Sequence, residues 1–341
     1  MWYTECGKDG DVVLSSRVRL ARNIKGIPFP ARADEKQQEE VIEKCKEALL
    51  DKKSPYHKTM YYIDLGAMED FEKQALAERH LMSPQMLEHD KKRGLLLSND
   101  NAISIMLNEE DHIRIQTMAP GFEIDRCFAE ANAVDDLIAG SVAIAFDEQY
   151  GYLTCCPTTV GTGMRASVML HLPAMTMSGT LSSISNSLSQ LGITIRGIYG
   201  EGSKALGNIY QISNQLTLGE TEEDIIDKFK QIVADVVEKE RELRQRIYEA
   251  EKFSFEDKLM RSFGVLKFAV AMSSDEAMKR LSDLRFSINL GLIKEVSLET
   301  VNRLTYDVMP ANIIQKYNIH DAKERDLKRA EIIKEALEKT S

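Results

Sequence analysis

Short stretches in which apolar and β-branched residues alternate predict strands along the first two-thirds of the chain. They lie at residues 60–65, 102–107, 113–116, 141–146, 167–172, 193–197 and 209–217. Several are separated by too few residues for a helical crossover, so antiparallel pairing is favoured. Helical periodicity occurs at residues 35–50, 69–79, 124–138 and 176–191. Together these patterns predict an α+β fold in which helices flank an antiparallel sheet.

The pattern changes at Thr221, after which apolar residues recur at helical spacing as far as Ile247. Thr221 is followed by three acids, which is typical of a helix N-terminus. Further on, the chain predicts short helices separated by Ser, Asp, Gly or Pro, and a highly charged last helix from about Asp321. We therefore expect two domains: an α+β domain at residues 1–250 and a small all-helical domain at residues 251–341.

Composition narrows the class of protein. The chain has 341 residues, 43% of them hydrophobic, and a formal net charge of -10. This acidic balance argues against a nucleic-acid binder, although a few arginines could still converge on a local anion site. The apolar runs are too short to cross a bilayer, and the first residues lack an apolar signal region. Five cysteines, an odd number, favour reduced thiols. We expect a soluble cytoplasmic protein with no membrane or nucleic-acid partner.

An acidic triplet, Glu109, Glu110 and Asp111, stands directly before His112 and two residues ahead of Arg114. A solvated turn is the simpler interpretation of three consecutive acids. This triplet, however, lies between two predicted strands, where alternation directs some side chains along one face. We therefore predict a functional carboxylate in this segment.

A segment of small residues follows Cys155 and Cys156. Gly161, Gly163 and Ala166 match the G-x-G-x-x-A dinucleotide pattern. That fingerprint requires a helix next, and the following residues alternate like a strand, so a Rossmann site is rejected. What remains is a loop with Cys156 and Arg165, in which Cys156 is either a buried structural thiol or a thiol in a site.

The segment 196–203 has the glycine spacing of a Walker loop. Ser203 and Lys204 stand where that loop requires Lys followed by Ser or Thr, so a P-loop is not expected. Several glycines surround Glu201 instead. The segment is either a flexible hairpin or a mobile loop that closes over a ligand and delivers Glu201.

Arg17 and Arg19 stand two residues apart in a β-branched context. In an extended chain, alternation would direct both side chains to the same side. Two adjacent like charges require an anion or carboxylates beside them, and arginine favours planar, bidentate recognition of the kind that phosphate offers. The pair therefore predicts an anion site.

These four segments together resemble the phosphagen kinase superfamily, and in particular the bacterial protein-arginine kinases. The family's motifs S-[ST]-R-V-R, N-E-E-D-H-x-R-I, C-P-[ST]-N-x-G-T and R-G-x-x-G-E correspond, in the family's order, to residues 15–19, 108–115, 156–162 and 196–201. The chain departs from the family at Thr159, where the motif has Asn. It also lacks, before Ser15, the helical domain that precedes the catalytic domain in small-guanidine kinases.

The resemblance implies a phosphotransferase that uses ATP and Mg²⁺, with Mg²⁺ held through the ATP phosphates and by no protein ligand. It assigns ATP binding to Ser15, Arg17, Arg19, His80, Arg114, Arg165 and Arg196, with His80 lying against the adenine. It assigns catalysis to Glu110, Glu201 and Cys156. In this scheme Glu110 removes a proton from the guanidinium, Glu201 orients its opposite edge, and Cys156 contacts it as a thiolate.

The missing helical domain favours protein substrates with exposed arginine over free arginine or another small guanidine. A kinase for such a small guanidine, and a non-catalytic phosphoarginine-binding adaptor, are the alternatives. The segment 325–330 resembles the R-D-x-x-R-A element of protein-arginine kinases. It would bind phosphoarginine through Arg325, Asp326, Arg329 and Ala330, although its composition alone is that of a solvated helix face.

The resemblance also implies partners. These are a heat-shock repressor as substrate, an activator protein, and a Clp chaperone–protease that degrades marked proteins. A homodimer formed through the C-terminal helices is expected as well.

Overall fold

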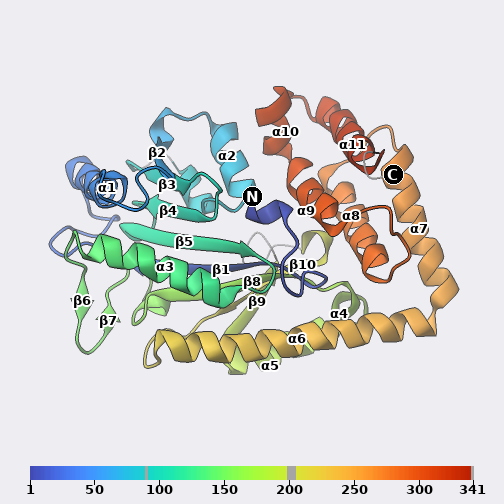
Figure 1. Cartoon of the computed structure of the whole chain (residues 1–341), viewed down its shortest axis with the longest axis horizontal. Helices are drawn as coiled ribbons and strands as arrows, with labels where there is room; N and C mark the ends of the chain where they lie inside the picture. Colours follow the sequence, from blue (N-terminus) through green and yellow to red (C-terminus); the bar gives the residue numbers. More distant parts are fainter. Residues whose placement is uncertain (89–90, 198–204, 339–341) are drawn as a thin grey trace.

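An antiparallel eight-stranded sheet forms the centre of the molecule (Figure 1). The computed structural model describes residues 1–88, 91–197 and 205–338. Across the sheet the strands follow in the order β2 (Met60–Asp64), β3 (Gly94–Ser98), β4 (Ile103–Leu107), β5 (Ile113–Pro120), β1 (Val13–Arg22), β8 (Met164–His171), β10 (Ile209–Asn214) and β9 (Ile193–Gly197). Each neighbouring pair is antiparallel, so the predicted α+β class with an antiparallel sheet is confirmed.

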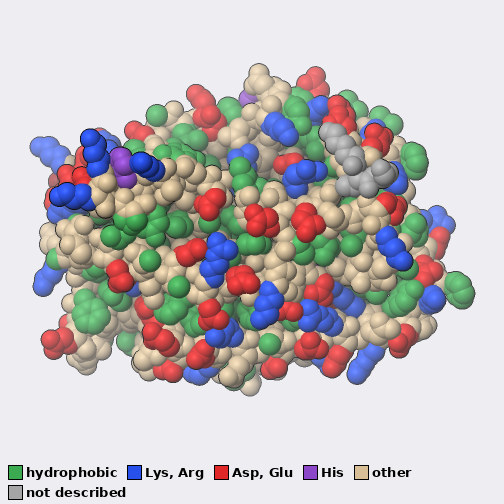
Figure 2. All heavy atoms as spheres, in the orientation of Figure 1, with side chains coloured by type: hydrophobic (Ala, Val, Ile, Leu, Met, Phe, Trp, Pro, Cys, Tyr) green, Lys and Arg blue, Asp and Glu red, His purple; other side chains and the backbone are tan. Residues whose placement is uncertain are grey.

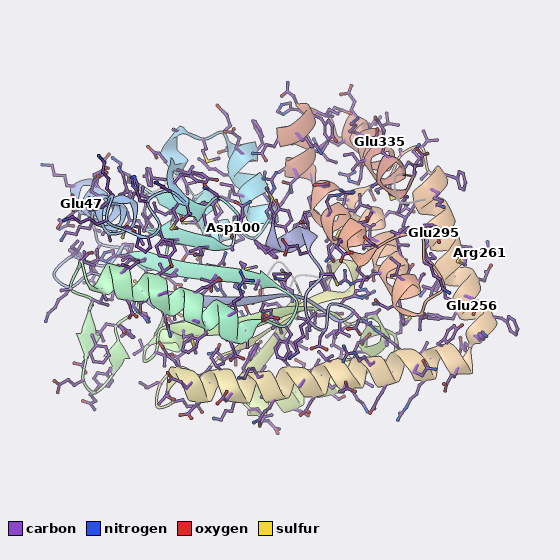
Figure 3. All side chains as sticks on the ribbon, in the orientation of Figure 1. Glu47, Asp100, Glu256, Arg261, Glu295 and Glu335 are labelled. Carbon is purple, nitrogen blue, oxygen red and sulfur yellow. The ribbon has the colours of Figure 1, made fainter. Side chains whose placement is uncertain are left out.

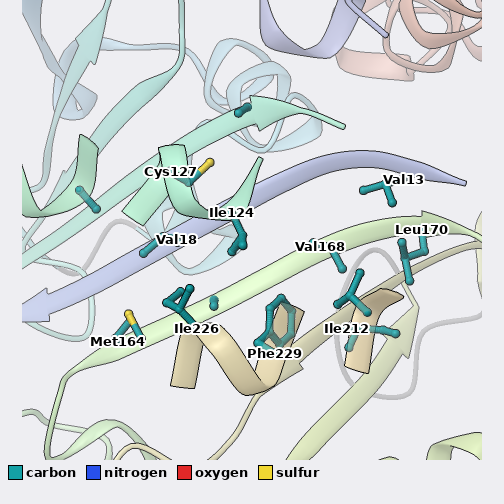
Figure 4. Packing of buried hydrophobic residues seen from close by; sticks show 14 of the residues in the cluster. Val13, Val18, Ile124, Cys127, Met164, Val168, Leu170, Ile212, Ile226 and Phe229 are labelled. Atoms are coloured by element: carbon teal, nitrogen blue, oxygen red, sulfur yellow. The ribbon is translucent and has the colours of Figure 1, made fainter. Parts of the chain in front are cut away.

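One face of the sheet is apolar. Val18 and Ile212 alternate with polar neighbours on their strands, and both are fully buried, as is Val168. They pack against the helices α1 (Glu35–Leu50), α3 (Ile124–Ala139) and α6 (Glu222–Ala250). Figure 4 shows Phe229 of α6 and Cys127 of α3 on this face. Burying each large apolar side chain contributes about 1.5–3 kcal/mol, which makes this layer the main core.

The opposite face is apolar only at its two ends. At one end α2 (Asp70–Glu78) and the segment after it cover Leu95 and Leu97 of β3 and Met106 of β4. At the other end the C-terminal helices cover Met118, Met169 and Ile209. Between these two covers lies a polar stretch of the face, formed by the middle of β5, β1, β8, β10 and β9.

Within the described residues, five helices follow α6. They are α7 (Lys252–Phe268), α8 (Ser274–Asn289), α9 (Leu298–Asp307), α10 (Pro310–Tyr317) and α11 (Ala322–Glu338). The predicted domain boundary falls at the junction of α6 and α7, close to Glu256, which is labelled in Figure 3. There the Tyr248 hydroxyl donates to Glu256 at 2.6 Å. Trp2 and Leu14 share an apolar cluster with these helices, so packing crosses that boundary. The division into two domains stays a prediction.

The surface in Figure 2 has acidic and basic side chains interspersed over this face of the molecule. No helix in the described part of the chain combines the length and apolar character needed to span a membrane.

Several predicted elements have the limits that the hydrophobic pattern indicated. The helix at 35–50 is α1, the strand at 193–197 is β9, and Thr221 is the N-cap of α6, with its side chain accepting a hydrogen bond from the backbone N–H of Asp224 at 3.1 Å.

Two predictions were wrong. The strand at 141–146 is a loop with one bridge from Ile144, followed by the small hairpin β6 (Phe146–Asp147) and β7 (Gly151–Tyr152). The helix at 176–191 is divided into α4 (Pro173–Met177) and α5 (Leu181–Gln190), because Gly179 between them adopts φ +70°. Strand β3 was missed, since it is buried on both faces and its leucines do not alternate with polar residues.

A buried histidine joins the sheet to the C-terminal helices. The Nε2 atom of His171, at the end of β8, lies 2.8 Å from the Ser282 hydroxyl of α8. Arg244 of α6 donates to the His171 carbonyl at 2.8 Å, and its guanidinium lies 3.5 Å from Nδ1. Burial lowers the pKa of His171 well below its usual value, and the charges of Arg244 and Arg285 lower it further.

We expect the protein to lose stability as the pH falls from about 7 to 5, and the variant His171→Gln to lose less. The unfolded chain binds a proton at His171 near pH 6.5, whereas the folded protein keeps this imidazole neutral. The free energy of unfolding should therefore fall below that pH, and glutamine, which does not titrate, should remove about 1–2 kcal/mol of this fall at pH 5. Urea unfolding at several pH values measures it.

The exposed His57 provides the matched control, because His57→Gln should leave the pH dependence as it is in the parent protein. Parallel pH profiles for His171→Gln and the parent would show that His171 does not contribute to acid sensitivity.

Candidate active site

Strand pairing brings five arginines from four strands to the polar stretch of the sheet. Arg19 of β1 lies opposite Arg165 of β8, and Arg17 lies on the same face two residues earlier. On the other side of β1, Ala21 pairs with Arg114 of β5. Arg196 of β9 pairs with Gln211 of β10. Gln211 in turn pairs with Met169 of β8, which lies on the same face of the sheet as Arg165. Because cross-strand partners project from one face, all five side chains point to the same side of the sheet.

Two cavities lie over this face. The larger, of about 820 Å³, is lined by Arg19, Ala21, Gln85, Glu110, Arg114, Cys156, Thr158, Thr159, Gly163, Arg165, Arg196, Gln215 and Leu216. The smaller, of about 230 Å³, is lined by Arg17, Arg19, Ala77, His80, Met82, Ser83, Pro84, Gln116, Arg165, Arg196, Gly197 and Gln211. Arg19, Arg165 and Arg196 line both. The arginines therefore form a shared wall, with Glu110 and Cys156 on one side and His80 on the other.

The arginines are crowded by their own positive charge. Desolvation, together with the charges of the nearby Arg165 and Arg114, lowers the pKa of Arg17 to about 10. Desolvation and the charges of Arg17, Arg114 and Arg165 also lower the pKa of Arg19. Such a cluster is unfavourable by itself and becomes favourable when an anion binds it.

Two hydrogen bonds hold Arg17 in place, with its guanidinium donating to Ser167 at 3.2 Å and to Gln211 at 2.7 Å. The buried Nε atoms of Arg19 and Arg165, in contrast, have no hydrogen-bond partner within the described residues. A polyphosphate would supply the missing acceptors and the missing negative charge. These arginines therefore fit a nucleoside triphosphate.

Arg114 forms ion pairs with two acids of the triplet, and these two acids differ in burial. One of its terminal nitrogens lies 2.6 Å from the buried Glu109, and the other lies 3.0 Å from Glu110. Glu109 also accepts a hydrogen bond from Ser83 and lines neither cavity. The Glu110 side chain is 35% exposed and lines the larger cavity. Glu110 is thus the acid of the triplet that lines the larger cavity, and its role as the base stays a prediction.

Asp111 and His112 hold the surrounding loops together. The Asp111 carboxylate accepts hydrogen bonds from the Asn23 side chain and from the Cys155 backbone N–H, both at 2.7 Å. Nδ1 of His112 accepts a hydrogen bond from the backbone N–H of Ile24 at 3.0 Å, so this ring is neutral with its proton on Nε2. Asp111 therefore fixes the chain directly before Cys156.

The loop that begins at Cys156 is built around a short turn. The Cys156 sulfur lies 3.0 Å from the Thr158 hydroxyl, and both residues line the larger cavity. Thr159, the residue that departs from the family motif, donates to the Thr154 hydroxyl or to the Cys156 carbonyl, at 2.9 and 3.0 Å. Its hydroxyl thus closes the turn from within the loop.

His80 lines the smaller cavity and is held by contacts with β5 and with α9. Its carbonyl accepts a hydrogen bond from Gln116 at 2.8 Å, and its ring meets Tyr306 of α9 edge to face at 6.0 Å. The preceding helix α2 is anchored by Glu78, whose carboxylate caps α10 through two backbone N–H groups at 3.0 Å. Desolvation, together with the charge of Arg17, lowers the pKa of His80 to about 3. A neutral imidazole ring is better suited to contact a nucleobase than to contact a phosphate group.

Two predicted site residues line neither cavity or cannot be placed. Ser15 is on the arginine face but fully buried, and it lines neither cavity. Glu201, with the rest of 198–204, lies outside the described residues. Within those residues, no group of three His, Cys, Asp or Glu side chains is arranged to hold a metal ion.

The segment 325–330 lies on α11, away from both cavities. Arg329 is buried and donates to the carbonyls of Val308 and Met272, at 2.7 and 2.8 Å, and Ala330 beside it is also buried. Arg325 is half-buried and donates to the His320 carbonyl. Arg329 therefore anchors α11, whereas Arg325 and Asp326 lie nearer the surface.

The structure adds residues that no motif indicated. Gln211 and Ser167 fix Arg17, and Ser83 fixes Glu109. These residues come from strands and turns far apart along the chain. Only the strand order, and no spacing within the sequence, could have identified them.

Comparisons with known proteins agree with this geometry. Residues 40–243 match the family ATP:guanido phosphotransferase, C-terminal catalytic domain, and residues 252–341 match the protein-arginine kinase McsB C-terminal domain. The chain is 45% identical to the protein-arginine kinase of Caldanaerobacter subterraneus, over 97% of this chain and 98% of that protein. It is 44% identical to the protein-arginine kinase of Bacillus subtilis, over 98% of this chain and 93% of that one.

Among solved structures, a duplicated taurocyamine kinase from Schistosoma mansoni with bound transition state analog components is similar, with a TM-score of 0.62 and 26% identity. That match covers 70% of this chain and 35% of the longer kinase. A lombricine kinase shares the fold, with a TM-score of 0.60 and 24% identity over 70% of this chain and 68% of that one. The chain belongs to the ATP:guanido phosphotransferase family, among the protein-arginine kinases.

Proposed function

We propose that this protein transfers the γ-phosphoryl group of ATP to arginine side chains of protein substrates. The observation that carries the proposal is the shared wall of arginines between two cavities, one of which also contains Glu110 and Cys156. Phosphoryl transfer depends on alignment and charge stabilisation, which such an arrangement supplies.

In this proposal the arginines bind the phosphates, and His80 lies against the adenine. Arg19, Arg165 and Arg196 line both cavities, which suits the position of the group in transfer. Their charge stabilises the oxygens of that group as negative charge develops there. Mg²⁺, held through the ATP phosphates, would neutralise further charge on the β- and γ-phosphate oxygens.

The acceptor guanidinium carries a proton that must leave, because its pKa lies above about 12. Glu110 is proposed as the base. In the structure it already accepts a hydrogen bond from a guanidinium, that of Arg114, at 3.0 Å. As Glu110 takes the proton, the freed lone pair of the nitrogen forms the N–P bond. The P–O bond to ADP breaks, and ADP leaves with the electron pair of that P–O bond. Glu201 and Cys156 keep their predicted roles within this proposal, whereas Ser15, which is buried and lines neither cavity, is given no direct contact with ATP.

The decisive experiment is phosphosite mass spectrometry under non-acidic conditions, after incubation with ATP, Mg²⁺ and an arginine-rich protein such as casein. Phosphate on arginine supports the proposal, and phosphate absent from every arginine contradicts it. ATP consumption with free arginine tests the alternative of a small-guanidine kinase. Acid-labile ³²P on the protein substrate would exclude a non-catalytic adaptor.

Arg325 and Asp326 are proposed to contact phosphoarginine on α11. The half-buried Arg325 is held only by the His320 carbonyl among its described hydrogen bonds, so its guanidinium retains donors for a phosphoryl group. We expect Arg325→Ala to weaken phosphoarginine binding about tenfold or more in calorimetry. The exposed Arg261, bonded to Asp257 on α7, is the matched control. Unchanged affinity in Arg325→Ala would make the segment an ordinary charged helix face.

The proposed setting is the bacterial cytoplasm and the heat-shock response, with a heat-shock repressor as substrate and an activator protein and a Clp chaperone–protease as partners. All five cysteines are free, in keeping with a reducing compartment. The proposed homodimer would use the C-terminal helices, where Phe253, Met260 and Phe268 of α7 are exposed. Sedimentation at micromolar concentration tests the dimer, and a single monomeric species would contradict it.

A further inference from the structure

A second groove lies beside the larger cavity, at the β6–β7 hairpin. Its volume is about 330 Å³, and its walls come from this hairpin, from residues 161–162, from residues 217–220 and from Glu222. Three large side chains at the groove are unusually exposed: Phe146 (55%), Tyr150 (49%) and Leu218 (57%). Figure 1 shows the hairpin extending beyond the sheet, below α1. Apolar surface gathered in this way is typical of a binding site.

The floor of this groove is held rigidly. Phe146 meets Tyr152 edge to face at 5.2 Å, and the Tyr152 ring lies 3.5 Å from the guanidinium of Arg22. Arg22 itself is fully buried, bonded to Asp135 at 2.8 Å and to the Thr162 carbonyl at 3.0 Å. The aromatic surface is therefore supported from below by a fixed cation, and it is ordered before any molecule binds.

The groove and the larger cavity share a wall. The backbone of Tyr152 pairs with Gly161, and the Thr217 hydroxyl donates to the Val160 carbonyl at 2.7 Å. A Cβ atom on Gly161 would lie 2.2 Å from the Thr217 carbonyl oxygen, so the two segments touch backbone to backbone. Two segments, from Thr158 to Gly163 and from Gln215 to Leu218, thus form the wall between the larger cavity and the groove.

The charges of the groove narrow the class of occupant. Its described charged lining residues are Glu220 and Glu222, each near a basic partner, Lys228 and Arg22 respectively. Arg22, a cation beneath the groove, is covered by the Tyr152 ring and bonded to Asp135. The groove therefore suits apolar or basic side chains and disfavours phosphates and acidic chains.

We propose that this groove binds the chain segment next to the target arginine of a protein substrate, packing an aliphatic or aromatic side chain against Phe146, Tyr150 and Leu218. This proposal rests on the proposed function, because it assumes that the target arginine enters the larger cavity. Since the two sites share a wall, one extended segment can reach both. Arginines with an apolar neighbour in the sequence would then be preferred substrates, and free arginine would make no use of the groove.

The test compares Leu218→Ser, Tyr150→Ser and the parent protein in steady-state kinetics. The substrates are peptides with one arginine, flanked on either side by leucine or by serine. We expect each variant to raise KM for the leucine peptides about five- to tenfold, the effect of losing one buried apolar contact. For the serine peptides, KM should stay unchanged, as should kcat and the KM for ATP with all peptides. Tyr61→Ser, on the exposed edge strand β2 at the far side of the sheet, is the matched control.

The outcomes separate this inference from the proposed function. A parent protein that phosphorylates no arginine would overturn both. A parent that is active but treats leucine and serine peptides alike, or variants with unchanged KM, would overturn the groove alone. Variants that alter sedimentation but not KM would identify the surface as a contact between copies of the chain and would also overturn this inference.

Discussion

The variant Glu110→Gln is expected to phosphorylate arginine about a thousandfold more slowly than the parent protein, the usual cost of losing a positioned general base. Glutamine has the shape of glutamate and can still accept a hydrogen bond from Arg114, so the site should keep its geometry. It cannot accept the proton that the guanidinium must release. Rates at saturating ATP, with casein as substrate, measure the effect.

ATP affinity decides what such a loss of rate means. Glu110 lines the larger cavity only, whereas Arg19, Arg165 and Arg196 line both, so the dissociation constant for ATP should stay within about twofold of the parent value. Glu43→Gln, an exposed acid of α1 paired with Lys46, is the matched control and should be fully active. A parallel loss of ATP binding in Glu110→Gln would show that this residue holds the nucleotide site together and is not the base.

The variant Arg19→Met is expected to bind ATP about a hundredfold more weakly and yet to be more resistant to unfolding. Arg19 is desolvated among Arg17, Arg114 and Arg165, and its Nε atom has no hydrogen-bond partner within the described residues. Removing this charge relieves repulsion, so the free energy of unfolding should rise by about 1–2 kcal/mol. Calorimetry with ATP and urea unfolding without it measure the two effects.

Arg22→Met should have the opposite outcome, although Arg22 is only three residues away on the same strand. Its guanidinium is bonded to Asp135, to two backbone carbonyls and to the ring of Tyr152. Methionine there would leave the carboxylate of Asp135 buried without its partner, which costs about 3–5 kcal/mol. If Arg19→Met were as destabilised as Arg22→Met, the arginine cluster would be a structural network and not a preformed anion site.

The contrast between Arg19 and Arg22 shows where sequence interpretation ends. Both are arginines of one extended segment, and the alternation of a strand predicts that they project to opposite faces. Which of those faces is the core depends on α1, α3 and α6 packing on one side. That choice is made by contacts between distant segments, and no local pattern contains it.

Local patterns were sufficient where the interaction itself is local. The helix α6 begins at Thr221 because its side chain caps the first turn, and the α+β class follows from short strands too close together for crossovers. The same patterns failed at β3, which is buried on both faces, and at residues 141–146, where apolar residues form a loop against the core. In both cases tertiary packing, and not the hydrophobic period, decided the conformation.

By itself the sequence determined the fold class, the family motifs and the residue types of the site. The tertiary structure decided which of those residues act together. Strand register placed Arg19 beside Arg165, and Arg114 divided the triplet into a buried Glu109 and a cavity-facing Glu110. The tertiary structure also placed the β6–β7 hairpin against the loop of Cys156, and the groove lies between them. The physical reason is that side-chain direction is a local property of a strand, whereas the neighbour that a side chain meets depends on long-range pairing.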